Sequence, residues 1–122
     1  MHKNHDITSE ASPEISFDDF LKVDMRVGTI VKVNDFPKAR KPAYQLKIDF
    51  GDLGVKTSSA QITNLYTKEE LLHRQVNAVV NFKPRQIANF KSECLVLGVY
   101  NDDNHVVLLQ SSKAIKNGEQ IN

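Results

Sequence analysis

The sequence has no tryptophan and only one cysteine, Cys94, among its 122 residues. One thiol can form neither an internal disulfide nor a cysteine-based zinc site, so disulfide scaffolds and zinc fingers are excluded. With five glycines and four prolines, the chain is also too poor in these residues to be of low complexity. The rest of the composition, 40% hydrophobic and 25% charged, indicates one globular domain with its own apolar core.

The sequence also lacks long apolar runs. No segment approaches the roughly 18 apolar residues that a membrane-spanning helix needs. The polar residues 1–6 do not resemble the apolar segment of a signal peptide. We therefore expect a cytoplasmic protein with no membrane insertion.

Charge is distributed unevenly, although the net charge is only +1. Residues 1–20 have a balance of −4, whereas residues 21–122 have a balance of +5. The positive balance of residues 21–122 suits a surface that binds anionic or acidic partners. The alternative is that these charges are evenly mixed and solvated and bind no partner. Residues 1–14, which are polar and without periodicity, are predicted to form a flexible N-terminal arm.

The first regular element expected is a short helix after this arm. Ser16 can cap its N-terminus, and two aspartates suit its first turn. Phe17, Phe20 and Leu21 then share one face, which suits packing on the rest of the domain or on a second subunit.

In most of the remaining chain, apolar and polar residues alternate with the period of two that is typical of strands. In the first strand this period places Val27, Val31 and Val33 on one face. The strands are expected at residues 26–33, 43–50, 55–61, 75–82, 95–100 and 105–109.

A capping box of Thr67 and Glu70 predicts one helix between the third and fourth strands. The near-continuous apolar runs at residues 95–100 and 105–109 predict burial on both strand faces or against a partner. This order of elements predicts an all-β protein with short helices: a five-stranded OB-fold barrel with N- and C-terminal extensions.

An OB-fold binds its ligands across the second and third strands and the flanking loops. The loops expected at residues 34–42 and 83–91 flank this face and are rich in cations. Converging cations would suit a phosphate backbone or an acidic peptide, and unrelated solvated side chains are the alternative. The cations are Lys38, Arg40, Lys41, Lys83, Arg85 and Lys91.

Aromatic and small polar side chains border the same loops. Phe90 is a candidate ligand contact, whereas Phe82 is expected in the core. Hydroxyl and amide groups can bind an extended backbone without selecting its side chains. The alternative is that they bond within barrel ends and turns. The candidates are Ser58, Ser59, Gln61, Asn81, Gln86 and Ser92.

Patterns of catalytic and metal-binding residues are missing from the sequence. His73 and His105 have no nucleophile elbow, and no His-Glu-x-x-His or paired-carboxylate pattern occurs. Cys94 is expected to be a small core residue. His2 and His5 would make a poor metal site on a mobile arm. We expect neither an enzyme nor a metal or cofactor.

Two motifs resemble the tRNA-binding domain family, whose members occur free and as appendages of aminoacyl-tRNA synthetases. Residues 23–30, Val-Asp-Met-Arg-Val-Gly-Thr-Ile, resemble its opening motif. Residues 81–85, Asn-Phe-Lys-Pro-Arg, followed by Ser92 and Glu93, resemble its second signature.

Longer motifs are similar to one branch of that family, the CsaA-type bacterial chaperones associated with protein export. Cys94-Leu95 also stands where the tRNA-binding branch has Gly-Met, which favours the CsaA-type branch. The motifs lie at residues 38–43, 46–51, 58–63 and 81–93.

The resemblance implies that residues 15–122 form a tRNA-binding-type OB-fold domain with dimerisation extensions. It implies a homodimer that holds unfolded or presecretory polypeptides, contacts the export machinery and also binds tRNA. A structure-specific tRNA-binding protein is the alternative. We assign the dimer interface to Phe17, Phe20, Leu21, Val106 and Leu108. The apolar surface of the segments that contain these residues exceeds what one side of a small barrel needs.

Overall fold

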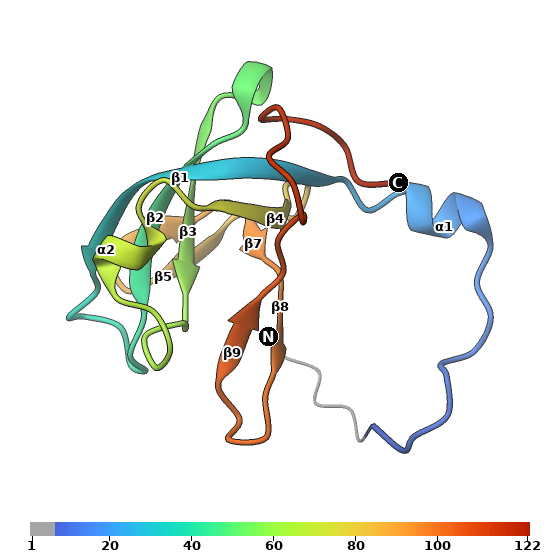
Figure 1. Cartoon of the computed structure of the whole chain (residues 1–122), viewed down its shortest axis with the longest axis horizontal. Helices are drawn as coiled ribbons and strands as arrows, with labels where there is room; N and C mark the ends of the chain where they lie inside the picture. The colour runs from blue at the N-terminus through green and yellow to red at the C-terminus, as the bar shows by residue number, and fades with distance from the viewer. Residues whose placement is uncertain (1–6) are drawn as a thin grey trace.

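The computed structural model describes residues 7–122. Its main sheet contains β1 (Met25–Asp35), β2 (Tyr44–Asp49), β3 (Val55–Ala60), β4 (Gln75–Val79) and β7 (Leu95–Val96). The strand order β3-β2-β1-β4-β7 curls into a nearly closed barrel (Figure 1). The predicted five-stranded, OB-fold-like barrel is confirmed.

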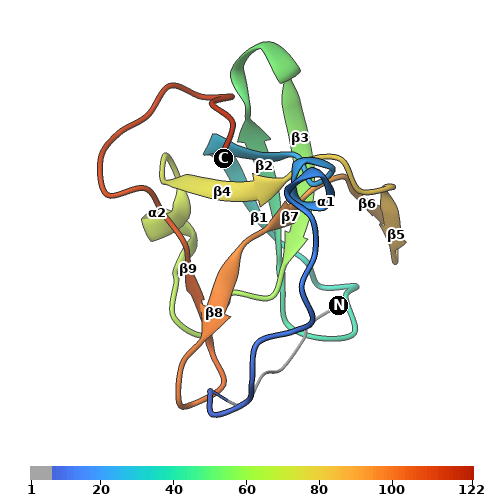
Figure 2. The same cartoon turned by 90° about the vertical axis from the view of Figure 1, so that its right-hand side faces the viewer.

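Two short hairpins extend from this barrel. One pairs β5 (Arg85–Ile87) with β6 (Phe90–Ser92), and the other pairs β8 (Gly98–Tyr100) with β9 (Val106–Leu108). Figure 2 shows the two hairpins leaving the barrel in different directions. The strand expected at residues 95–100 is therefore divided, because β7 joins β4 whereas β8 joins β9.

The two predicted α-helices are present and are capped as expected. In α1 (Phe17–Leu21), the Ser16 hydroxyl accepts a hydrogen bond from the Asp19 N–H. In α2 (Lys68–Leu71), Thr67 and Glu70 form the reciprocal capping box. A 3₁₀ helix, η1 (Gly51–Leu53), follows β2. Figure 1 shows α1 beside the barrel, after a segment that loops away from it.

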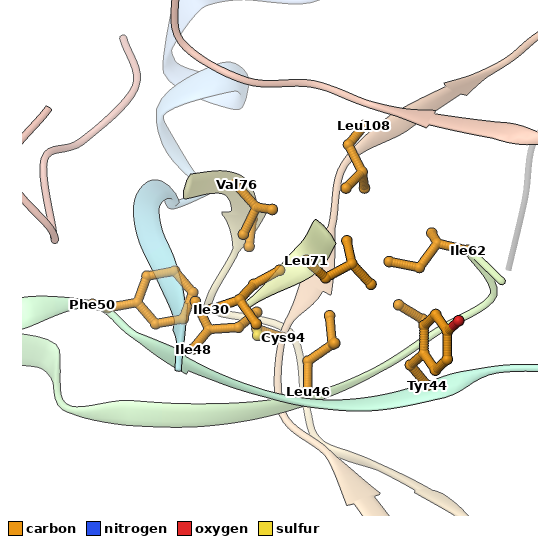
Figure 3. Packing of buried hydrophobic residues seen from close by; sticks show 12 residues of the cluster. Ile30, Tyr44, Leu46, Ile48, Phe50, Ile62, Leu71, Val76, Cys94 and Leu108 are labelled. Atoms are coloured by element: carbon orange, nitrogen blue, oxygen red, sulfur yellow. The ribbon is translucent and has the colours of Figure 1, made fainter. Parts of the chain in front are cut away.

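The barrel is filled by apolar side chains from several elements (Figure 3). Ile30 of β1 is fully buried, whereas its neighbour Val31 is 41% exposed. The prediction that Val31 shares one face with Val27 and Val33 is wrong, because a register shift between Ile30 and Lys32 interrupts the strict alternation of β1.

The C-terminal extension runs along the first residues of β1. The Gly118 N–H donates to the Val27 carbonyl, the Val27 N–H donates to the Glu119 carbonyl, and the Ile121 N–H donates to the Met25 carbonyl. These bonds satisfy backbone groups of β1 that lie beyond its pairing with β2. The extension is thus part of the barrel wall.

The N-terminal segment from Ile7 to Ile15 contains no helix or strand, and its side chains are exposed. His2 and His5, like the rest of residues 1–6, lie outside the described part of the chain. No helix within residues 7–122 has the length and apolarity needed to cross a membrane.

Candidate functional site

A groove of about 770 Å³ gathers many of the predicted binding residues. It is lined by the loop between β1 and β2, the end of β3, β5 with its following turn, and β7. These segments are far apart in the sequence, so the fold brings the two cationic regions to one place. The predicted residues in its lining are Lys38, Arg40, Lys41, Ser59, Gln61, Arg85 and Gln86.

The apolar part of this lining was missed by the sequence reasoning. The signal in the sequence was the pair Ala60 and Ile62, two apolar residues spaced two apart at the end of the third expected strand. Val106, which we expected at a dimer interface, also lines the groove. The apolar residues are Ala39, Ala43, Ala60, Ile62, Ile87, Ala88, Leu95, Val96 and Val106.

The cations around this groove are exposed, and none of them has a counter-ion among residues 7–122. Within residues 7–122, the ion pairs join Lys22 to Asp19, Arg26 to Asp24, and Lys68 to Asp35. None of these pairs involves a groove residue. A cation without an internal partner remains available to the anionic groups of a ligand. We call Lys38, Arg40, Lys41 and Arg85 the cationic rim.

A second hollow of about 310 Å³ adjoins the groove and shares Ser59 and Arg85 with it. Lys83 and Ser92, two further predicted residues, line this hollow together with Phe82. The prediction that Phe82 lies in the core is wrong: its side chain is 44% exposed, because β4 ends at Val79. Phe82 thus supplies an aromatic surface beside the rim.

Glu93 joins the segment before β7 to β3. Its Oε1 accepts hydrogen bonds from the Thr57 N–H and hydroxyl, both at 2.9 Å. The N–H bond is the main cause that lowers the pKa of the Glu93 carboxyl below its ordinary value. The N–H groups of Glu93 and Cys94 donate to the Thr57 carbonyl at 2.8 and 3.2 Å. The barrel wall is therefore closed at Thr57.

Two of the predicted polar contacts hold the fold together instead of facing the groove. Ser58 is only 1% exposed, and its hydroxyl donates to the Cys94 carbonyl at 2.8 Å. The Asn81 side chain accepts from the Asp24 N–H and donates to the Lys22 carbonyl. Ser58 is corrected from ligand contact to buried structural residue. Asn81 fastens the chain after β4 to the start of β1.

The other predicted residues of the β5–β6 hairpin also have structural contacts. The Phe90 ring packs edge to face on buried Phe36, with ring centroids 5.5 Å apart. The Lys91 carbonyl accepts a bond from the Thr57 hydroxyl. Ser92 Oγ accepts from the Ser59 N–H at 3.0 Å. These contacts fix the hairpin that carries Arg85 into the groove.

Cys94 and Leu108 are both buried and offer little surface for chemistry or for a partner. Burial raises the pKa of the Cys94 thiol to about 12, so the thiol stays protonated at neutral pH. The expectation that Cys94 is a core residue is confirmed. Leu108 is 9% exposed and points into the same core cluster (Figure 3). The prediction that Leu108 offers free apolar surface is wrong, because the chain buries it itself.

Residues 25–120 match the family model described as a putative tRNA binding domain. The chain belongs to this family. Among solved structures, it is 54% identical to the CsaA chaperone of Picrophilus torridus, with a TM-score of 0.84 over 89% of this chain and 100% of that one. It is 49% identical to the chaperone CsaA of Bacillus anthracis, with a TM-score of 0.85 over 90% and 100% of the two chains. The chain is thus a CsaA-type tRNA-binding domain protein, as its motifs predict.

Methionine--tRNA ligases are among the curated relatives that this domain resembles. The chain is 39% identical to that of Pyrococcus abyssi over 88% of its own length, and 35% identical to that of Bacteroides fragilis over 97%. It spans only 14% and 18% of those two ligases. The shared family is defined by tRNA binding and not by a reaction.

Proposed function

We propose that the chain is a cytoplasmic, homodimeric chaperone that holds unfolded or presecretory polypeptides for the export machinery. The observation that carries this proposal is the mixed lining of the groove. Partly exposed apolar residues such as Ile87, Leu95 and Val96 can cover apolar side chains of a client, while the cationic rim pairs with its acidic side chains. A folded client hides its apolar side chains, so the groove favours unfolded chains.

The small size of many lining side chains suits a binder of many sequences. Ala39, Ala60 and Ala88 contribute only small side chains to the lining of the groove. Ser59 and Gln61 add polar groups that any extended backbone can meet. This combination gives low selectivity, which a holder of varied clients requires.

Transfer RNA is the second ligand that we propose for the same groove. The exposed rim suits phosphate oxygens, and Phe82 beside it suits a base face. The family match and the ligase relatives favour this candidate. A protein that binds tRNA alone is therefore the alternative to the chaperone, and both use the same cations.

Competition between the two ligands tests the proposal. We expect tRNA to displace a fluorescently labelled, urea-denatured presecretory protein, and the denatured protein to displace labelled tRNA. Displacement of neither ligand by the other would contradict a shared groove. Binding of tRNA without any binding of the denatured protein would leave the tRNA-binding alternative.

A dimer is proposed from apolar side chains that the single chain leaves exposed. Phe17 and Leu21 of α1 are 69% and 50% exposed, and Val99 and Leu109 of the β8–β9 hairpin are 52% and 40% exposed. Apolar patches of this kind on a small protein mark interfaces. Two-fold pairing would place two grooves in one particle, which would then hold one long client with greater avidity.

Sedimentation equilibrium tests this pairing. We expect twice the chain mass of 13.8 kDa for the wild type at micromolar concentration, and a monomer for Phe17→Glu combined with Leu21→Glu. Leu53→Glu, at a residue that is also 40% exposed, is the matched control and should remain dimeric. A monomeric wild type, or a monomeric variant that captures denatured chains as well as the dimer does, would contradict the two-groove mechanism.

A further inference from the structure

β3 is the last strand of the main sheet and forms a strand ladder with β2 alone, while β6 and β7 lie beside part of its other edge. In an antiparallel strand, alternate residues direct both backbone polar groups away from the neighbouring strand. Thr57 does so, since its N–H and carbonyl bond to Glu93 and Cys94. Ser59 does so as well, because its N–H donates to Ser92 Oγ. The next residue in this alternation is Gln61, directly after the strand.

This edge is occupied at Thr57 and at the Ser59 N–H, and it is open at the exposed Gln61. After Cys94 the chain leaves β3 and pairs with β4 as β7. Within residues 7–122, no hydrogen bond outside the strand ladders reaches the Ser59 carbonyl or either backbone group of Gln61. Ser59 and Gln61 both line the groove. Unpaired backbone groups along an edge form a template for another strand.

We propose that a polypeptide in the groove binds as an added β-strand, hydrogen-bonded to the open edge of β3 at Ser59 and Gln61. This inference rests on the proposed chaperone function and specifies how the client is held. Backbone bonds are the same for every amino acid, so strand addition supplies affinity without selecting a sequence. It also requires the client to be extended, which a folded protein does not offer.

The lining of the groove indicates which extended segments bind best. Side chains of an added strand alternate between two faces, so one set can lie against apolar residues such as Ile87 and Ala88. Acidic residues at the ends of the segment can reach the cationic rim. The preferred client segment is therefore extended, alternately apolar and flanked by aspartate or glutamate.

Backbone methylation of a peptide tests strand addition separately from groove binding. The parent probe is a fluorescent, acetylated peptide, Asp-Thr-Leu-Thr-Leu-Thr-Leu-Thr-Asp. Two N-methylated forms are compared with it: one is methylated on the three leucine nitrogens, and the other on three of the threonine nitrogens. Because alternate N–H groups of a strand point to opposite sides, we expect one isomer to bind at least about tenfold more weakly and the other to bind like the parent. Isomers that bind alike, whether tightly or weakly, would overturn strand addition. A parent peptide that does not bind would contradict the proposed function itself.

A substitution on the protein provides the complementary test. Gln61→Pro removes the free N–H at an edge position where proline is tolerated, and Gln61→Ala is the matched control that keeps it. Because both variants lose the Gln61 side chain, the comparison between them isolates the N–H, and we expect the proline variant to bind the peptide about tenfold more weakly than the alanine variant. Equal peptide affinity of the two variants, or a change of oligomeric state in the proline variant, would overturn the inference.

Amide hydrogen exchange in the wild type covers the case in which Gln61→Pro does not fold. An added strand would accept a bond from the Gln61 N–H, so peptide binding should slow exchange of this amide at least tenfold. The Ser59 amide, which is already bonded to Ser92, provides the internal comparison. An unchanged Gln61 exchange rate at saturating peptide would overturn strand addition.

Discussion

The two ends of the segment from Thr57 to Gln61 differ in what satisfies their polar groups. At Thr57 and Ser58, backbone and side-chain groups bond to Glu93 and Cys94. At Ser59 and Gln61, which line the groove, the Ser59 carbonyl and both backbone groups of Gln61 accept or donate no bond outside the strand ladders within residues 7–122. The same kinds of small polar residue therefore serve stability at one end and ligand binding at the other. The course of the neighbouring chain decides between these roles.

The cationic rim belongs to the open end, and its removal should have the largest effect. We expect Arg40→Ala, Lys41→Ala and Arg85→Ala together to lower tRNA affinity on the order of 100-fold at low salt. Each lost phosphate contact should also flatten the slope of log K against log salt by about 0.7–0.9. Titrations over a series of salt concentrations measure both quantities.

The control for this variant removes three exposed cations elsewhere on the barrel and its C-terminal extension: Lys32, Lys47 and Lys113. These residues do not line the groove, so their replacement by alanine should retain most of the slope. Stability should change little in either variant, because the rim residues have no internal ion pair within residues 7–122. Equal slopes for the two triple variants would remove the rim from the binding site.

Adjacent serines test the comparison directly. Ser58→Ala leaves the buried Cys94 carbonyl without its hydroxyl donor, so we expect the free energy of unfolding to fall by about 2 kcal/mol. The Ser59→Ala variant keeps the backbone bond from residue 59 to Ser92, so its free energy of unfolding should fall by less than about 0.5 kcal/mol. Urea unfolding of both variants measures the difference. Similar losses for the two serines would mean that both ends of this segment contribute alike to stability.

Elements whose signals are local were predictable from the sequence. The Ser16 cap, the Thr67–Glu70 capping box and the alternation of β2 depend on residues close together in the chain. The irregularity of β1 at Val31 was not predictable, because the bulge follows from pairing with β2. The division of residues 95–100 likewise depends on separate partners, β4 and β9.

The candidate site was predictable where exposure alone decides, and not where long-range bonding decides. The cations of two loops were found because cations remain at the surface and the OB-fold brings those loops together. Ser58 and Asn81 were misplaced because their partners lie 36 and 57 to 59 residues away. No local pattern distinguishes a serine that meets a carbonyl across the barrel from one that faces a groove.

The smallest expected effect concerns the acid that closes the barrel wall at Thr57. Because its folded pKa is lowered by the Thr57 N–H, the Glu93 carboxylate stabilises the fold above its ordinary pKa of about 4.3. This stabilisation is lost as the pH falls through the lowered folded pKa. Glu93→Gln keeps an acceptor oxygen but removes the charge, so we expect the free energy of unfolding to fall by about 1 kcal/mol or less at neutral pH.

The pH profile of unfolding distinguishes this charge effect from a general loss of packing. The stability difference between wild type and Glu93→Gln should be constant above about pH 5 and should shrink as the pH falls below it. Glu69→Gln, which removes an exposed carboxylate of α2, is the matched control and should show little difference at any pH. A Glu93→Gln difference that persists undiminished at about pH 3 would show that the carboxylate charge does not secure the closed end of β3. Peptide affinity at neutral pH should be the same in all three proteins, because the open edge at Ser59 and Gln61 stays in place.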